Sequence, residues 1–354
     1  MSGSEPAAPD NSARPEPLGD FNVDARMLRI TAWAVPVGLL SAGLAFALLR
    51  LIGLITNLVF YQRWDTHLVA PGGGPHHPWP LVLLAPVAGG LIVGLMARFG
   101  SEKIRGHGMP EAIEAILVGE SRIQPRIALL KPISAAVSIG TGGPFGAEGP
   151  IIMTGGAAGS ILAQHLHLSA DERKTLLVVG AAGGMAATFN APLASVLLAV
   201  ELLLFEWRPR RLVPVVGAVA TSTVARGALL GTGAIFALPT VHVHLHATIA
   251  LLCVLAGVLG GLLAIIATGL VYASEDAFHR LPIHWMWWPA LGGLIIGILV
   301  VKTAIWSLSL GSGTSGGVLA PVLMIGAALG APEGHVVPAV LPGRWPALRP
   351  CSAA

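Results

Sequence analysis

The residue with the most distinctive chemistry is Glu148, in the stretch GGPFGAEGP from Gly142 to Pro150. It is a single carboxylate between glycines, within some of the most apolar sequence of the chain. A carboxylate held near helix N-termini is either stabilised as an anion by their N–H groups or neutralised by protonation. The stretch therefore predicts an acid with two accessible charge states. The alternative is that Glu148 only caps a helix at an aqueous surface.

Three stretches combine glycines with proline inside or beside apolar sequence: GHGMPE at 106–111, GTGGPFGAEGP at 140–150 and GSGTSGGVLAP at 311–321. A continuous transmembrane helix does not tolerate so many helix breakers, so we expect irregular backbone that ends where the proline begins the next helix. Irregular backbone at membrane depth survives only where protein buries it or where it lines a cavity. Helix N-termini that point into such a cavity form a site for an anion. The alternative is that the breakers mark loops at the membrane surface.

The composition places these stretches in a membrane protein. Of the 354 residues, 54% are hydrophobic and only 11% are charged, whereas soluble domains have roughly 25% charged residues. The cations are scattered and form no basic stripe with interleaved aromatic residues, so nucleic acid is not an expected partner. Apolar segments about as long as the core of a lipid bilayer recur. They lie at 30–58, 80–96, 175–189, 192–205, 247–272 and 288–301.

The placement of charge predicts the orientation in the membrane. Arginines and lysines cluster at 26–29, 98–105 and 208–211, which we expect to be cytoplasmic, and the loop 62–78 should face the other side. Residues 1–28 are mostly polar and rich in Pro, Ala and Ser, so they are expected to form a disordered cytoplasmic tail. The chain is then a multi-pass integral protein of a bacterial-type plasma membrane, with its N-terminus in the cytoplasm.

Glycines four residues apart predict close helix packing, because small residues let helix backbones approach in lipid. The glycine pairs are Gly90 with Gly94, Gly155 with Gly159, Gly257 with Gly261, and Gly293 with Gly297.

The two cysteines, Cys253 and Cys351, form no disulfide framework.

The three breaker stretches, in this order and joined by LLKPISAAVSIGTG and FNAPLASVLLAVE, resemble the CLC family of chloride channels and chloride/proton antiporters. The resemblance covers residues 32–338. It implies an all-α polytopic membrane protein with tilted, broken and re-entrant helices in an inverted repeat, and a homodimer with one anion pore in each subunit. The transmembrane pore domain is expected at 29–340 and an irregular tail at 341–354. We expect no cofactor and no metal ion.

The resemblance also assigns roles to residues. Glu148 matches the family's gating glutamate, which occupies the outer chloride site when ionised and swings away when protonated. The positions that match the anion-binding motifs are Gly106, His107, Gly108, Met109, Pro110, Gly146, Gly149, Pro150, Gly317, Val318, Leu319 and Pro321.

Three of the matched positions depart from the family pattern. His107 replaces the usual serine at the central anion. An imidazole can donate a hydrogen bond or carry a charge, so the replacement bears on both the anion preference and the pH response. The alternative is that His107 only caps a broken helix. Leu319 replaces the usual phenylalanine, which is tolerable because the backbone donors remain. Ala147 replaces a basic residue, which weakens the positive field around Glu148.

The proton pathway is the deepest departure. Antiporters of the family usually have two adjacent acids after NAPL, and this chain has Glu201 followed by Leu202. That pattern favours channel-like or weakly coupled conduction. The alternative is a chloride/proton antiporter that uses Glu201 or Glu206 as its relay, because Glu206 lies about one helical turn beyond Leu202. Otherwise Glu206 is a solvated charge at the membrane interface.

The chain also differs from the family at its C-terminal end. The family core continues through further helices, one of which supplies a pore tyrosine, whereas Tyr61 and Tyr272 lie outside any matching motif. The core is therefore expected to be incomplete at the C-terminus, either truncated or altered in frame near Trp345.

Two rival interpretations come from short motifs. Residues 313–316 fit the G-x-S-G pattern of intramembrane serine proteases, with Ser315 as nucleophile and His335 as base, but no oxyanion partner can be named. The alternating histidines of HVHLH at 242–246 would gather a metal ion on one face of an extended strand. A polar loop before the next span is the favoured interpretation of that segment.

Overall fold

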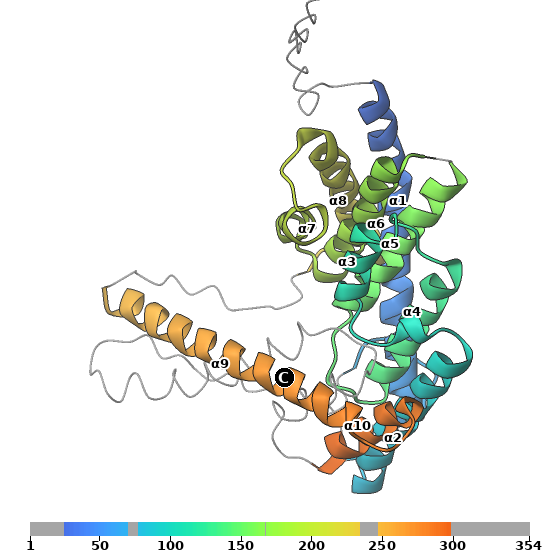
Figure 1. The fold of residues 1–354 in the computed structure, drawn as a ribbon, viewed down its shortest axis with the longest axis vertical. Coiled ribbons are helices and arrows are strands. Elements are labelled where there is room, and N and C mark those ends of the chain that lie inside the picture. The colour runs from blue at the N-terminus through green and yellow to red at the C-terminus, as the bar shows by residue number, and fades with distance from the viewer. Residues whose placement is uncertain (1–24, 70–76, 167, 234–246, 299–354) are drawn as a thin grey trace, which may run out of the picture.

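The computed structural model describes residues 25–69, 77–166, 168–233 and 247–298 (Figure 1). In these ranges the chain forms helices and their connections and no β-strand, which confirms the predicted all-α class. The α-helices are α1 (Ala25–Thr56), α2 (Trp79–Phe99), α3 (Met109–Leu117), α4 (Pro125–Gly140), α5 (Glu148–His165), α6 (Ala170–Phe189), α7 (Pro192–Leu198), α8 (Pro209–Leu230), α9 (Ala247–His279) and α10 (Trp288–Ile298). Short π-helices, η1 (Asn57–Tyr61) and η3 (Ala199–Leu204), and short 3-10 helices, η2 (Glu102–Ile104) and η4 (Trp285–Trp287), adjoin them.

Four helical segments in the described part are long and apolar enough to cross a membrane: Arg26–Tyr61, Trp79–Phe99, Pro209–Leu230 and Gly257–His279. Three of them overlap apolar segments predicted from the sequence. The span in α8 was missed, because its arginines interrupt the apolar pattern. In the fold, Arg211 and Arg226 are nearly buried and donate to polar partners within the protein.

The core is built around α6, which lies among α1, α5 and α8 (Figure 1). All of its residues from Thr175 to Thr188 are buried. At the crossing with α5, a side chain on Gly155, Gly159 or Gly180 would overlap a backbone oxygen of the other helix. Small residues thus bring the two backbones into contact, as the spacing predicted.

The same kind of packing joins α2 to α10 and to η4. A side chain on Gly90 would overlap the backbone at Pro289, and one on Gly293 would overlap the carbonyl of Pro86. The pair Gly257 and Gly261 behaves differently, since no described atom lies within 4 Å of the Cβ position of either residue. The predicted helix contact at that pair is not seen among the described residues, and it stays a prediction.

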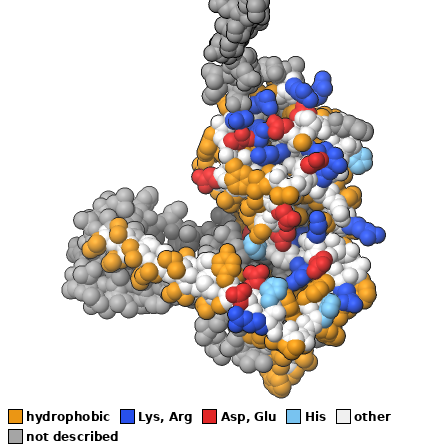
Figure 2. Space-filling model, viewed as in Figure 1, with side chains coloured by type: hydrophobic (Ala, Val, Ile, Leu, Met, Phe, Trp, Pro, Cys, Tyr) orange, Lys and Arg blue, Asp and Glu red, His pale blue; other side chains and the backbone are white. Residues whose placement is uncertain are grey.

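The long helix α9 projects from the bundle (Figure 1). Its C-terminal end is anchored by Phe278, whose ring lies 5.9 Å from that of Trp288. Most of the described side chains of α9 are apolar and exposed, and Figure 2 shows hydrophobic side chains along this helix. A surface of this kind faces lipid or another protein surface, and not water.

The ends of the first span lie on opposite sides of the bundle. The span covers 36 residues from Arg26 to Tyr61, about 54 Å of helix at 1.5 Å per residue. This exceeds the roughly 30 Å of a bilayer core. The segment 62–69 therefore lies at the face opposite to Arg26.

Candidate functional site

Two helix N-termini meet at the predicted site. Helix α3 begins at Met109 after Gly108, and α5 begins at Glu148 after Ala147. Irregular backbone precedes both, as predicted for the first two breaker stretches. The first N–H groups of a helix have no partner within it, so each N-terminus carries a partial positive charge.

The two N-termini touch through glycines. A Cβ atom on Gly108 would lie 2.6 Å from the carbonyl oxygen of Gly149, and one on Gly149 would overlap the carbonyl of His107. Gly106 and Gly108 also have φ angles of +75° and +97°, a conformation that residues with side chains rarely adopt. Glycine is required at these positions by the close approach of the two segments as well as by the turn.

Glu148 is the first residue of α5 and is only 6% exposed. Its carboxylate folds back over Gly146, where even a methyl group would overlap Oε2. The glycine before the acid therefore creates the space that the carboxylate occupies. An acid in this place lies near the positive ends of two helices, which favour its ionised form, and is removed from water, which favours its protonated form.

Buried polar contacts hold the loop before α3. Glu111 accepts a hydrogen bond from the backbone N–H of Gly108 at 2.9 Å. Lys131 of α4 is fully buried, and its Nζ donates to the carbonyl oxygens of Ile104, Arg105 and Gly106 at 2.9, 3.1 and 2.8 Å. Lys131 is not among the residues predicted to form the site. The available signal was a cation within the apolar sequence of α4, because intramembrane charges are costly and usually functional.

A cavity of about 910 Å³ adjoins this loop, and His107 and Pro110 form part of its wall. Helices α5, α9 and α10 complete the wall with Met153, Tyr272 and Trp288 among others. The guanidinium of Arg105 stacks on Trp285 and Trp288, 4.7 and 5.6 Å from the ring centroids. The ionisable residues around the cavity are Glu102, Lys103, Arg105, His107, Glu111, Glu114, Arg122, Tyr272, Glu275 and His279.

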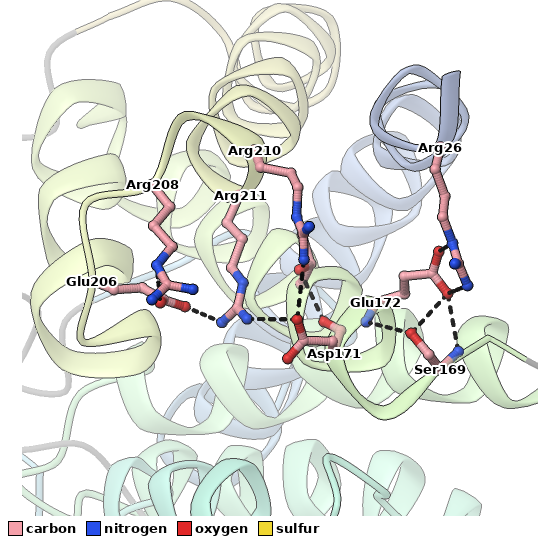
Figure 3. Close-up of polar contacts among 9 residues, drawn as sticks. Arg26, Ser169, Asp171, Glu172, Glu206, Arg208, Arg210 and Arg211 are labelled. Carbon is pink, nitrogen blue, oxygen red and sulfur yellow. Dashed lines mark hydrogen bonds and ion pairs between the residues drawn. The ribbon is translucent and has the colours of Figure 1, made fainter. Parts of the chain in front are cut away.

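The two candidate proton relays have different surroundings. Glu201 is exposed on η3. Glu206 is held in ion pairs with Arg208, at 2.9 Å, and with Arg211 (Figure 3). Arg211 also binds Asp171 of α6 at 2.7 Å, so Glu206 belongs to a network that links α8 to α6.

Several predicted residues lie outside the described ranges. They include the third breaker stretch with the protease candidate Ser315, and the HVHLH segment. Within the described residues, no three His, Cys, Asp or Glu side chains are placed to hold a metal ion. The structure thus brings together the first two of the three predicted anion-binding stretches. The predicted anion-binding residues outside the description are Gly317, Val318, Leu319 and Pro321.

Comparison with known proteins assigns the chain to a family. The model of the voltage gated chloride channel family matches residues 89–301 and 296–353. The chain belongs to this family. Its relatives include a ClcB-like protein of Ralstonia nicotianae, 30% identical over 76% of this chain and 71% of the relative. The voltage-gated ClC-type chloride channel ClcB of Salmonella typhimurium is 29% identical, over 90% of this chain and 83% of the relative.

Solved structures of CLC proteins share the fold. A slow cyanobacterial Cl⁻/H⁺ antiporter has a TM-score of 0.74 at 20% identity, over 91% of this chain and 83% of its own. A CLC-type fluoride/proton antiporter also has a TM-score of 0.74, at 16% identity, over 90% of this chain and 83% of its own. The predicted CLC-type fold is therefore confirmed. These comparisons give no support to an intramembrane protease.

Proposed function

We propose that this CLC-family chain carries chloride or a related small anion across the membrane, with Glu148 as the gate. One observation carries the proposal: Glu148 is buried at the N-terminus of α5, and the next residue, Gly149, packs against the segment that begins α3. The names of the relatives, which are chloride channels, support the choice of anion. The activity is transport and not catalysis.

The gate follows from the charge of the carboxylate. When ionised, it is attracted by the N-termini and occupies the place of a permeating anion. When protonated, it loses that attraction and leaves the place free. The anion is then bound by backbone N–H groups around residues 106–110, 146–150 and 317–321, with His107 at the wall of the adjoining cavity.

We propose channel-like or weakly coupled conduction. Leu202 takes the place of the second acid, and the ion pairs of Glu206 favour a structural role for that residue. Glu201 or Glu206 would serve as relay if the chain were an antiporter. We further propose a homodimer in a bacterial plasma membrane, with the N-terminus in the cytoplasm.

The test is to record chloride efflux and external pH together from chloride-loaded liposomes that contain the full chain, with valinomycin to carry potassium. Efflux without proton movement is the expected result. Proton movement opposite to chloride would contradict the channel-like proposal and establish antiport. Absence of chloride efflux would contradict the transport function itself.

Glu148→Gln tests the gate. If the gate opens when the carboxyl group is protonated, the open fraction falls about tenfold for each pH unit above the pKa of that group. We expect the variant to conduct chloride with no such pH dependence, because glutamine stays neutral. Glu114→Gln is the matched control, since Glu114 lines the cavity and lies outside both N-termini; it should keep the pH dependence. A pH profile of Glu148→Gln equal to that of the wild type would rule out this gate.

A further inference from the structure

A second cavity, of about 190 Å³, lies at the N-terminal end of α1 and shares no lining residue with the cavity beside His107. It is formed between three helices, two of which are candidate membrane spans. Its lining is Arg26, Met27 and Ile30 of α1, Asp171, Glu172 and Thr175 of α6 with the preceding Ser169, and Arg210 and Arg211 of α8. Figure 3 shows the charged residues of this lining and Ser169.

The cavity has an excess of positive charge. Arg210 and Arg211 share Asp171, at 3.3 and 2.7 Å, and Arg26 pairs with Glu172 at 2.5 Å. Three guanidinium groups thus line the cavity with two carboxylates, and a third carboxylate outside the lining, Glu206, also pairs with Arg211. Each guanidinium has five N–H donors in a planar fork, so Arg26 and Arg210, each paired with one carboxylate, keep donors available for a further anion.

Glu172 is ionised at neutral pH and offsets one of the positive charges. Burial raises the pKa of Glu172, but hydrogen bonds from Arg26 and Ser169 outweigh it and hold the pKa below its ordinary value. Glu172 therefore counts as one full negative charge. One more cation, Lys174, lies near Arg211 and Asp171 of the lining.

Apolar residues line part of the cavity, and others are exposed on the two spans. Met27 and Ile30 form part of its wall. Farther into the membrane, Val35 on α1 and Val213 and Val216 on α8 are between 41% and 45% exposed. At the same end of α8, Trp207 is 62% exposed, and tryptophan is enriched at the boundary between lipid and water.

We propose that this cavity binds the phosphate of an anionic membrane lipid, whose acyl chains lie along the exposed apolar residues of α1 and α8. Guanidinium groups bind phosphate through paired, charge-assisted hydrogen bonds. Basic cavities between transmembrane helices are suited to anionic headgroups. The combination of arginines, hydroxyl groups and adjoining apolar surface matches a phospholipid better than a soluble phosphate, which would need no apolar path.

The test compares matched arginines in the purified, delipidated full chain. Native mass spectrometry measures the binding of phosphatidylglycerol and of phosphatidylcholine with the same acyl chains. Arg210→Gln should weaken phosphatidylglycerol binding by about tenfold, the value of one hydrogen bond between charged groups, and should keep the fold because Arg211 still holds Asp171. Arg208→Gln is the control, since Arg208 has a similar exposure but does not line the cavity.

A second pair, Arg26→Gln against Arg29→Gln, repeats the comparison on α1. Equal losses within both pairs would show diffuse surface attraction and overturn the site. Displacement of the lipid by an equal concentration of inorganic phosphate would assign the cavity to a soluble anion. Binding that occurs only after removal of residues 1–24 would show that the acidic N-terminal segment is the occupant. None of these outcomes depends on whether the chain conducts chloride.

Discussion

At the scale of the residue, the contact between Gly146 and Glu148 explains why glycines surround a buried acid. The carboxylate occupies the space that a side chain at Gly146 would fill. The residue after the acid, Gly149, packs its backbone against the backbone of His107 and Gly108. The glycines are thus a steric requirement of the carboxylate and of the neighbouring helix start, in addition to any freedom they give the backbone.

Gly146→Ala is predicted to displace the carboxylate. The added methyl group overlaps Oε2 of Glu148, and overpacking of this kind costs about 1–3 kcal/mol. Each 1.4 kcal/mol changes the equilibrium constant between the occupied and the displaced position of the carboxylate about tenfold, in favour of the displaced position. Chloride flux at neutral pH should therefore rise in the liposome assay. Gly217→Ala is the control, because its methyl group meets only Thr31 at 3.7 Å, and an equal rise there would contradict the prediction.

Lys131→Met is predicted to loosen the loop before α3. Methionine has a similar length but no donor, so the carbonyl groups of residues 104–106 lose their shared hydrogen-bond partner. Unpaired buried acceptors cost about 1–3 kcal/mol, partly offset because a buried charge is removed. The unfolding temperature should fall and chloride flux should decrease. Lys103→Met, at an exposed position, should change neither measurement; an unchanged Lys131→Met protein would show that the contacts are dispensable.

At the scale of the element, the bundle depends on contact between helix backbones. Between α5 and α6 this contact is made by glycines, and α1 and α8 add hydroxyl groups, since Ser41 and Ser222 donate to the carbonyl oxygens of Gly180 and Gly183. In lipid no hydrophobic force drives helices together, so such packing and hydrogen bonding hold them.

Gly180→Ala is predicted to separate α5 from α6. The methyl group overlaps the carbonyl of Gly155, and neither backbone can yield without a shift of the helix. The expected loss is about 1–3 kcal/mol in the free energy of unfolding, seen as a lower unfolding temperature in detergent. Gly43→Ala is the matched control, because no described atom surrounds its Cβ position, and it should stabilise α1 by about 0.5–1 kcal/mol. Equal behaviour of the two variants would contradict the packing argument.

At the scale of the whole molecule, α7 and α8 carry exposed apolar residues on the side of the bundle away from its core. Leu193 and Leu197, four residues apart on α7, are 73% and 40% exposed, and Val224 on α8 is 78% exposed. Such a surface faces lipid or another protein. It is therefore compatible with the proposed homodimer.

The purified chain is predicted to form a dimer. Light scattering coupled to size exclusion, corrected for detergent, should give twice the chain mass of 36.3 kDa. The dimer should persist on dilution, because close packing between helices, and not the covering of apolar surface, holds membrane subunits together. A single-chain mass at all concentrations would refute the homodimer.

The class of the molecule could be predicted from sequence because it depends on local pattern. Apolar length predicted membrane helices, and the density of Gly and Pro predicted the irregular segments before Met109 and Glu148. The α8 span was missed because Arg211 and Arg226 interrupt its apolar sequence. The sequence does not show that both arginines find acceptors within the protein, the carboxylate of Asp171 and the carbonyl oxygen of Gly231. The glycine spacing of 257 and 261 predicted a contact that the described part of α9 does not make.

The site itself was decided by contacts across the chain. Glu148 and the segment 106–108 are about forty residues apart, and nothing in either stretch says that Gly149 rests on His107. Lys131 is 25 to 27 residues from the carbonyl groups that it binds. Arg211 is 40 residues from Asp171, and Arg26 is 146 residues from Glu172. Residue type and spacing determined which groups were available, because helix formation and membrane insertion are local events. Only the packed tertiary structure determined which groups meet, because that depends on how whole helices cross.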